Sequence, residues 1–262
     1  ECFKMKKNHT FAILAYKESP YLEECIKSVM KQNKNSETLI MTQTPNNYIS
    51  EIAKKYNLEI VEIKSKGIGN AFDFALEYPK TKYVTICHQD DVYFDDYYNK
   101  VVKKMDDNTI IAFSDYYEFK NNHLVKTNTN LKIKRILLFP LKFFKKSIFV
   151  RRRSLSLGCC ICCPAVSFNK DKVKTPLFQN DEFRSDVDWQ AWEILSKQKG
   201  KFLYISEALM FHRVHDDSET SKVIADNKRT TEDLVMFKKF WPNSIAKFIC
   251  KIYSNSEKSN SE

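Results

Sequence analysis

The stretch from Tyr83 to Asp91 (YVTICHQDD) constrains the fold most, because an apolar run ends there in two adjacent carboxylates. A short apolar run that stops at such a polar switch predicts a buried parallel strand. Ligands of open α/β sheets bind beyond the carboxyl ends of the strands, so His88, Gln89, Asp90 and Asp91 are expected at a binding site. Adjacent carboxylates repel each other unless a cation offsets their charge, and Mg²⁺ or Mn²⁺ with a substrate diphosphate meets that need. Taken alone, however, an Asp-Asp pair is more often a solvated loop than a metal site.

The chain before this stretch alternates strands with helices. Strands are expected at 10–16, 37–42 and 58–63, and helices are expected after Ser19-Pro20, after the turn at 44–47, and after 66–70. Short connections between alternating strands and helices predict a parallel sheet that is covered by helices on both faces.

Beyond Asp91 the pattern becomes less regular. Helices are expected at 95–105, at 188–197 and from residue 230, and strands at 109–119, 161–168 and 202–210. Asn121-Asn122 predicts a hairpin turn towards a short strand at 124–127. The chain ends in a Ser/Asn/Glu tail that is expected to be disordered.

Composition narrows the choice of partner and compartment. The formal net charge of +10 requires an anionic partner, which could be nucleic acid, an anionic membrane or a phosphorylated substrate. Only four glycines are present, which argues against a Gly-rich phosphate loop. No apolar run approaches the ~20 residues that span a bilayer, and the run at 11–16 is too short for a signal peptide. Eight cysteines without an export signal then predict reduced thiols and a cytoplasmic protein.

Five segments in order resemble the pattern of family 2 glycosyltransferases, which have the GT-A fold. They are AYKESPYLEECIKSVMKQ, KGIGNAFDFAL, the strand ending in HQDD, SDVDWQAWEIL and HRVHDDSETS. The resemblance implies an α/β fold with a mostly parallel nucleotide-sugar-binding sheet flanked by helices, a smaller acceptor-side sheet and C-terminal helices. We therefore expect a GT-A glycosyltransferase domain at 8–221 and a C-terminal helical extension with a disordered polar tail at 222–262.

The resemblance also implies the reaction. Its members move a sugar from a nucleoside-diphosphate donor, usually with inversion and with Mn²⁺ or Mg²⁺. For this chain it implies a UDP-sugar donor and a glycan or lipid-linked acceptor in the synthesis of surface polysaccharide or lipopolysaccharide. Two rival hypotheses are a metal-dependent nucleotidyltransferase, which would use the same carboxylates, and a non-enzymatic basic protein that binds membrane or nucleic acid. Nucleic acid is the less suitable partner, because the most basic stretch is too apolar for a typical nucleic-acid-binding arm.

Site residues follow from the resemblance position by position. The family's Asp-x-Asp motif falls on His88-Gln89-Asp90, so His88 replaces the first acid, and Asp90 and Asp91 remain as metal ligands. His215 is a third candidate metal ligand. The residues implied to contact the donor lie near the ends of the first four strands, except for one in the HRVH segment: Ala15, Tyr16, Glu18, Thr42, Gln43, Thr44, Gly67, Asp73, His88, Gln89 and Arg213. Arg213 would neutralise the leaving diphosphate, since guanidinium groups bind phosphate through paired hydrogen bonds.

An inverting transfer needs a carboxylate that takes the proton of the acceptor hydroxyl. The family motif places that acid just before an aromatic residue, which favours Asp188 next to Trp189 and leaves Asp186 as the second candidate. The alternative is that Asp188 only caps a helix, since Asp is a good N-cap residue.

Two further features each allow two interpretations. Cys159-Cys160-x-Cys162-Cys163 suggests zinc or an iron–sulfur cluster, but adjacent cysteines on a strand point to opposite faces, which favours structural cysteines.

The stretch 132–153 combines many Lys and Arg with Phe and Leu and has no acidic residue. It suits a peripheral contact with the anionic inner face of a membrane, or an ordinary packed helix with a solvated basic face.

Overall fold

The computed structural model describes residues 7–32, 35–179, 183–214 and 228–259. Their strands form one nine-stranded sheet in the order β3-β2-β1-β4-β8-β6-β9-β5, and β7 pairs with β6. The strands are β1 (His9–Ala15), β2 (Ser36–Thr42), β3 (Glu59–Glu62), β4 (Tyr83–His88), β5 (Val92–Tyr93), β6 (Thr109–Lys120), β7 (His123–Val125), β8 (Val166–Asn169) and β9 (Lys201–Arg213).

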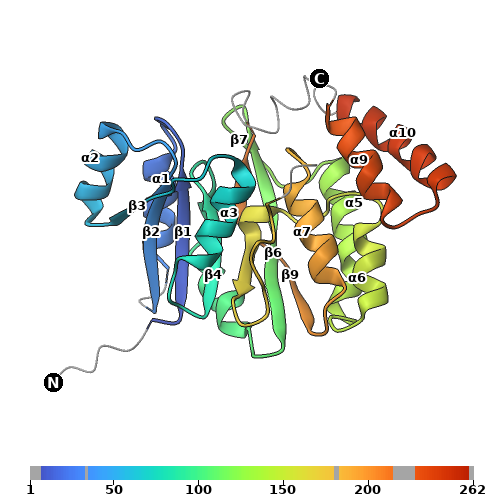
Figure 1. The fold of residues 1–262 in the computed structure, drawn as a ribbon, viewed down its shortest axis with the longest axis horizontal. Helices are drawn as coiled ribbons and strands as arrows, with labels where there is room; N and C mark the ends of the chain where they lie inside the picture. Colours follow the sequence, from blue (N-terminus) through green and yellow to red (C-terminus); the bar gives the residue numbers. More distant parts are fainter. Residues whose placement is uncertain (1–6, 33–34, 180–182, 215–227, 260–262) are drawn as a thin grey trace.

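Helices flank this sheet (Figure 1). They are α1 (Leu22–Met30), α2 (Asn47–Tyr56), α3 (Ile68–Glu77), α4 (Tyr97–Lys100), α5 (Thr129–Leu138), α6 (Ile148–Leu155), α7 (Val187–Ser196), α9 (Lys228–Lys238) and α10 (Asn243–Ser259). Three short 3₁₀ helices join them: η1 (Val102–Lys104), η2 (Phe139–Lys142) and η3 (Cys163–Ala165). Figure 1 shows α5, α6, α9 and α10 gathered at the end of the sheet opposite α2.

The expected α/β class and parallel sheet are confirmed. Strands β3, β2, β1 and β4 are parallel to their neighbours, β8 pairs antiparallel with both β4 and β6, and β9 runs parallel to β6. The strands on the acceptor side continue this sheet, whereas we expected a separate smaller one. The strand β8 causes the merger, because it pairs with the parallel half on one side and with β6 on the other.

Two hydrophobic cores lie on opposite faces of the sheet. Along β1, Phe11 and Ile13 belong to one core and Ala12 to the other, as the alternation of side chains along a strand requires. Helices α1, α2 and α4 contribute to the first core, and α3, α7, α9 and α10 contribute to the second. A sheet that is apolar on both faces explains why its central strands are near-continuous apolar runs.

Local signals fixed several element ends as expected. Asn46 caps α2 by accepting a hydrogen bond from Ile49 N at 2.9 Å. Asn121 and Asn122 have φ of 52° and 61° at the β6–β7 hairpin. Positive φ at both central residues is the requirement of a type I′ turn, which Asn tolerates.

Two predicted elements are shorter than expected. The strand predicted at 161–168 covers only β8, because Cys163–Ala165 form a 3₁₀ turn at Pro164, which has no N–H to donate to a sheet. The helix predicted at 95–105 is a single turn, α4, followed by η1.

The C-terminal helices share the core of the main sheet. Met236 and Phe237 of α9 and Ala246 and Cys250 of α10 are buried within it. Helix α10 extends to Ser259 and so includes most of the tail for which we expected disorder, since extending a formed helix adds a hydrogen bond per residue. The expected domain boundary at 221–222 lies outside the described residues. Within the described part of the chain, no helix is both long and apolar enough to cross a membrane.

Candidate active site

The predicted donor-binding residues of the first strands meet at one edge of the sheet. Ala15 and Thr42 are the last residues of β1 and β2, and Tyr16, Gln43 and Gln89 follow β1, β2 and β4 directly. All three strands are parallel, so their carboxyl ends lie together. The side-chain amide of Gln89 binds both backbone groups of Tyr16: its Oε1 accepts from Tyr16 N at 2.9 Å, and its Nε2 donates to Tyr16 O at 3.1 Å. Gln89 therefore clamps the ends of β1 and β4 together, and Tyr16 stays 46% exposed beside them.

The segment after β2 forms a second part of this edge. Thr44 Oγ1 accepts a hydrogen bond from Lys17 N at 2.6 Å, and Thr42 Oγ1 accepts from Thr44 N at 3.0 Å. Gln43 Nε2 donates to Gly67 O at 3.0 Å, which ties this segment to the start of α3. These bonds give the polar groups after β2 a fixed position next to the end of β1.

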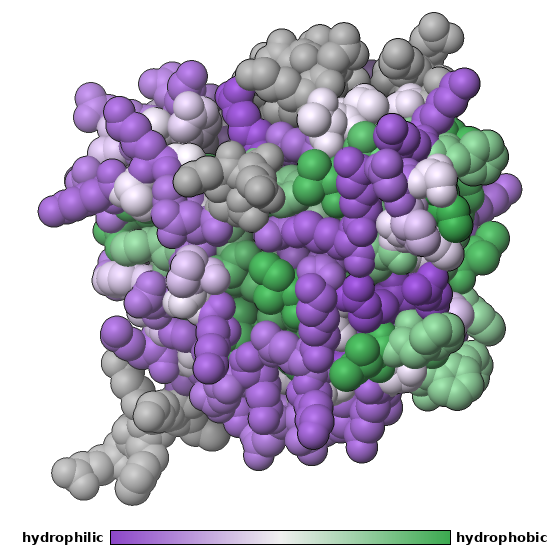
Figure 2. Space-filling model, turned by 45° about the vertical axis from the view of Figure 1, so that its right-hand side comes forward, coloured by the Kyte–Doolittle hydropathy of each residue, from purple (hydrophilic) through white to green (hydrophobic). Residues whose placement is uncertain are grey.

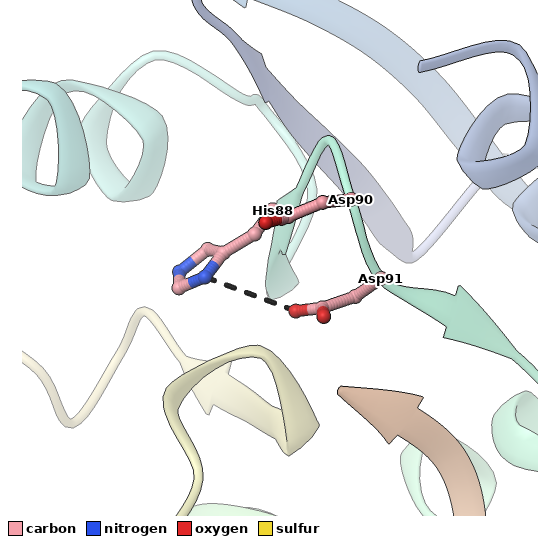
Figure 3. A group of neighbouring side chains, drawn as sticks. All are labelled: His88, Asp90 and Asp91. Carbon is pink, nitrogen blue, oxygen red and sulfur yellow. Dashed lines mark ion pairs between the residues drawn. The ribbon is translucent and has the colours of Figure 1, made fainter. Parts of the chain in front are cut away.

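A compact group of three candidate metal ligands follows β4. One ligand atom each from His88, Asp90 and Asp91 lies within 4.8 Å of the others. Figure 3 shows His88 and Asp91 pointing toward one another, with 3.8 Å between His88 Nδ1 and Asp91 Oδ2. The ring of His88 stacks on Phe72 at 5.4 Å between centroids, which fixes its plane.

Polar atoms in this group lack partners, which fits a cation site. Asp91 is fully buried, yet its Oδ2 has no hydrogen-bond partner among the described residues, and neither does the buried Nε2 of His88. Leaving a buried polar atom unpaired is costly, so each such atom calls for an explanation. The two carboxylates suit Mn²⁺ or Mg²⁺, and the imidazole nitrogen favours Mn²⁺, because Mg²⁺ prefers an all-oxygen shell.

His212 holds Asp91 from the opposite strand and was missing from our predicted site. Its Nδ1 lies 2.9 Å from Asp91 Oδ1, which also accepts from Arg213 N at 3.0 Å. Burial lowers the pKa of His212, but the charge and hydrogen bond of Asp91, together with the charge of Asp90, outweigh it and raise the pKa to about 9. Side chains alternate between the two faces along β9, so His212 points to the face opposite to Arg213. This alternation could have identified His212 as a separate candidate.

Arg213 is a buried structural cation in this structure. Its guanidinium donates to Glu24 Oε2 at 2.6 Å and to Asp90 O at 3.1 Å. It also lies over the ring of Tyr21, with 4.3 Å between Cζ and the ring centroid. These contacts use Arg213 to hold the turn after β4 against α1, so a contact with the diphosphate remains a prediction.

Two other predicted residues of the described chain, Asp73 and Glu18, do not belong to this group. The carboxylate of Asp73 accepts four hydrogen bonds from the N–H groups of Leu177, Phe178 and Gln179, which uses both of its oxygens to hold that segment. Glu18 is exposed after β1, and His215 lies outside the described residues.

The candidate base Asp188 lies in the first turn of α7 and does not cap it. The N-cap residue is Asp186, whose side chain makes no capping bond. Asp188 Oδ1 accepts from Trp189 N at 2.7 Å, and its Oδ2 lies 3.5 Å from Cys159 Sγ, which donates to it. Burial raises the pKa of Asp188 above its ordinary value, a shift toward the range that suits a general base.

Asp186 is buried below Asp188, among acidic neighbours. Burial and then the nearby charge of Asp233 raise its pKa well above the ordinary value, and its Oδ2 has no hydrogen-bond partner in the part of the chain that the structure describes. The loop before α7 is held by Glu232 of α9, whose carboxylate accepts from the N–H groups of Arg184, Ser185 and Asp186 at 2.8–3.1 Å. No local sequence signal predicts this contact, which joins residues 46–48 positions apart.

The cysteine-rich segment lies between the metal-ligand group and the base. The charges of both Asp91 and Asp188 raise the pKa values of Cys162 and Cys163, although burial is the larger cause. All seven cysteines in the described residues are free, and the only metal-ligand group found there is that of His88, Asp90 and Asp91. The segment is not the strand that we expected, and structural cysteines remain our interpretation of it.

Comparison with known proteins was made by family and by structure. The family model described as "Glycosyl transferase family 2" matches residues 10–173. That range contains all of the strand ends and the metal-ligand group, and it stops before Asp188. Among curated protein sequences there is no significant match.

Several solved structures share the fold at low identity. S. aureus TarS 1–349 in complex with UDP-GlcNAc superposes with a TM-score of 0.64 at 14% identity, covering 94% of this chain and 70% of that one. The mannosyltransferase PcManGT from Pyrobaculum calidifontis, in complex with GDP-Man and Mn²⁺, gives 0.60 at 14% identity, covering 90% and 64%. Glucosyl-3-phosphoglycerate synthase from Mycobacterium tuberculosis, with Mn²⁺, UDP-Glc and phosphoglyceric acid, gives 0.59 at 11% identity, covering 89% and 79%.

Proposed function

Since the chain belongs to glycosyl transferase family 2, whose members transfer a sugar from a nucleoside-diphosphate donor, we propose that it is a metal-dependent inverting enzyme that uses a UDP-sugar. The observation that carries this proposal is the placement of two kinds of group on either side of the cysteine-rich segment. On one side lie His88, Asp90 and Asp91, and on the other lies Asp188. UDP is favoured over GDP because two of the three similar structures described above hold a UDP-sugar.

Each residue then has a definite task. Asp188 accepts the proton of the acceptor hydroxyl while that oxygen attacks the sugar carbon and the bond from this carbon to the diphosphate breaks. Gln89 and Thr44 fix the strand ends that receive the nucleotide. His88, Asp90 and Asp91 would hold Mn²⁺ or Mg²⁺, which would neutralise charge on the leaving diphosphate. His212 keeps Asp91 oriented from β9.

The test of this mechanism is Asp188→Asn, assayed for both turnover and UDP affinity. A general base contributes typically about 10²–10⁴-fold to turnover, so a loss of that size is expected while UDP affinity stays near the wild-type value. Asp186→Asn is the matched control in the same loop. Loss of transfer in the Asp186 variant alone would move the base to that residue, and normal turnover in both variants would refute a base in this loop.

We further propose that the acceptor is a glycan or lipid-linked saccharide met at the inner face of a membrane, with the enzyme on the cytoplasmic side. Support comes from large apolar side chains exposed along α5, η2 and α6, which include Phe143 (67% exposed) and Phe149 (70% exposed). Exposed lysines lie among them, at 142, 145 and 146. Figure 2, in which this side is turned forward, shows apolar residues on the surface among hydrophilic ones.

Part of the basic stretch points inward and has another role. Arg151 is fully buried and donates to the backbone oxygens of Gly200 and Gln198, and Arg152 pairs with Glu193 at 2.7 Å. Lipid contact is therefore assigned to the exposed lysines and phenylalanines, since inserted aromatics and basic residues near anionic lipid both favour binding. Synthesis of a surface polysaccharide or lipopolysaccharide is the pathway that such an acceptor suits.

A further inference from the structure

Lys134 lies on the buried face of helix α5, where a lysine is unexpected. Leu131 and Leu138, three residues before and four after it, are buried in the two cores, and this spacing places all three on one side of the helix. The adjacent Arg135 pairs with Asp115 of β6 and donates to Lys126 O at 3.0 Å. These contacts fix the rotation of α5, so Lys134 points toward the sheet instead of solvent.

The surroundings of Lys134 place it between the two halves of the site. Its Nζ donates to the hydroxyl of Tyr116 at 2.9 Å and lies 5.6 Å from the centroid of that ring. The ring of Tyr116 in turn meets His212, the partner of Asp91, edge to face at 6.4 Å. The charge of Lys134 also lowers the pKa of both His212 and Asp188, opposing other and larger effects, so it acts on the metal-ligand side and on the base side.

Lys134 has no anionic partner in the part of the chain that the structure describes. Its only hydrogen bond there is to the neutral hydroxyl of Tyr116, and no carboxylate forms a salt bridge with it. Burial lowers the pKa of Lys134, but Tyr116, Tyr253 and Cys159 together outweigh it and leave the pKa above its ordinary value, so the side chain is charged at neutral pH. Lys134 is half-buried, and a partly desolvated charge without a counter-charge is unfavourable, so a bound anion would reduce that cost.

We propose that Lys134 is the phosphate-binding cation of the reaction cleft. Arg213, the only other cation for which the sequence suggested this task, is already paired with Glu24. The phosphate would come either from the donor diphosphate or from a phosphate group on the acceptor, since the charge of Lys134 acts both on His212, the partner of Asp91, and on Asp188. The proposal rests on the proposed function, because it assigns a ligand to the same cleft.

The experiment compares wild type with Lys134→Met, which keeps the length of the side chain and suits the apolar face of α5. If the donor diphosphate binds here, UDP affinity in Mn²⁺, measured by calorimetry, should fall about tenfold or more while uridine affinity is unchanged. If an acceptor phosphate binds here, UDP affinity should hold. Inorganic phosphate should then raise the melting temperature of the UDP- and Mn²⁺-saturated wild type but not that of the variant.

Two further variants make the outcome decisive. Lys134→Arg retains the charge and should retain the response, which separates a lost anion site from a damaged fold. Lys132→Met removes an exposed lysine from the same helix and should change neither quantity. Equal UDP affinity and equal phosphate response in wild type and Lys134→Met would overturn the proposal, as would the same losses in Lys132→Met. If wild type binds no UDP, the proposed donor is wrong, and the phosphate response of the Mn²⁺-loaded protein alone still decides the role of Lys134.

Discussion

Replacing Glu232 by glutamine should loosen the loop that carries the proposed base. The carboxylate of Glu232 accepts four hydrogen bonds: Oε1 from Arg184 N at 3.0 Å, and Oε2 from Ser185 N at 2.8 Å, Ser185 Oγ at 2.6 Å and Asp186 N at 3.1 Å. A glutamine side chain has one acceptor oxygen, so one bond is lost to a facing NH₂ group and the other three lose the charge. Bonds to charged groups contribute roughly 1.5–3 kcal/mol and neutral ones roughly 0.5–1.5 kcal/mol.

The lost hydrogen-bond free energies add up, and relaxation of the loop recovers part of them. We therefore expect Glu232→Gln to lower the free energy of unfolding by about 2–4 kcal/mol at pH 7. For a chain of this size that corresponds to a drop of roughly 4–10 °C in melting temperature. Turnover should also fall, because Asp188 follows the loop directly, while UDP affinity should be maintained. Differential scanning calorimetry and a turnover assay measure the two effects.

The pH dependence of this destabilisation provides a second check. Burial raises the pKa of Glu232, but its hydrogen bonds lower it by more, so the net shift is downward. A lowered pKa in the folded state gives stability that is present above the ordinary pKa of a glutamate and is lost as the pH falls. The gap between wild type and Glu232→Gln should therefore be widest near neutral pH and close in acid. Glu51→Gln, at an exposed position of α2, should show no gap. A Glu232→Gln variant that melts with wild type at pH 7, or a gap that does not change with pH, would refute this account.

Three other predictions test separate parts of the molecule. UDP binding should weaken strongly in EDTA and in Asp90→Asn, but not in the exposed Asp95→Asn; an affinity that does not depend on metal would exclude the proposed metal site. Burial lowers the pKa of His9 to about 3, so the unfolded chain binds a proton at His9 before the folded protein does. The free energy of unfolding should therefore fall by up to roughly 1.4 kcal/mol per pH unit below about pH 6.5. His9→Gln should flatten this dependence of stability on pH in acid denaturation curves. Co-sedimentation with anionic vesicles should fall with salt and in a variant with glutamine at 142, 145 and 146, and equal binding to neutral vesicles would argue against an electrostatic membrane contact.

The donor side of the fold could be predicted because its signals are local. Each of the first four strands is an apolar run that ends at turn residues, and parallel pairing then brings those ends together without further information. The group of His88, Asp90 and Asp91 lies within four consecutive positions, so the strand that carries it also assembles it. Where local signals misled us, as at Cys159–Cys163, a single Pro164 changed a strand into a turn.

The residues that the sequence did not reveal depend on distant contacts. Alternation along β9 predicts which face Arg213 occupies, but its partner Glu24 is 189 positions away and decides what the guanidinium can bind. Asp73 matched a donor-binding position, yet it binds backbone groups more than 100 positions further on. Lys134 is different, because its position between Leu131 and Leu138 at helical spacing was visible in the sequence as a charge on an apolar face. The membrane interpretation of the stretch 132–153 does not distinguish this inward-facing lysine from the exposed ones.

The acceptor side therefore has to be argued from geometry more than from family. The family match ends at residue 173, so it covers the metal-ligand group and Lys134 but not Asp188. Support for Asp188 comes from the structure: α9 holds the loop before it, Trp189 next to it is fully buried, and the N-cap position that would have explained it belongs to Asp186. Asp188 is a half-buried carboxylate without a capping role, and Lys134 is a half-buried lysine without a carboxylate partner in the described residues; both observations support the proposal that Asp188 exchanges a proton with the acceptor. This reasoning also predicts where acceptor specificity lies, namely on α5, α7 and α9, whose relative placement no local sequence signal determines.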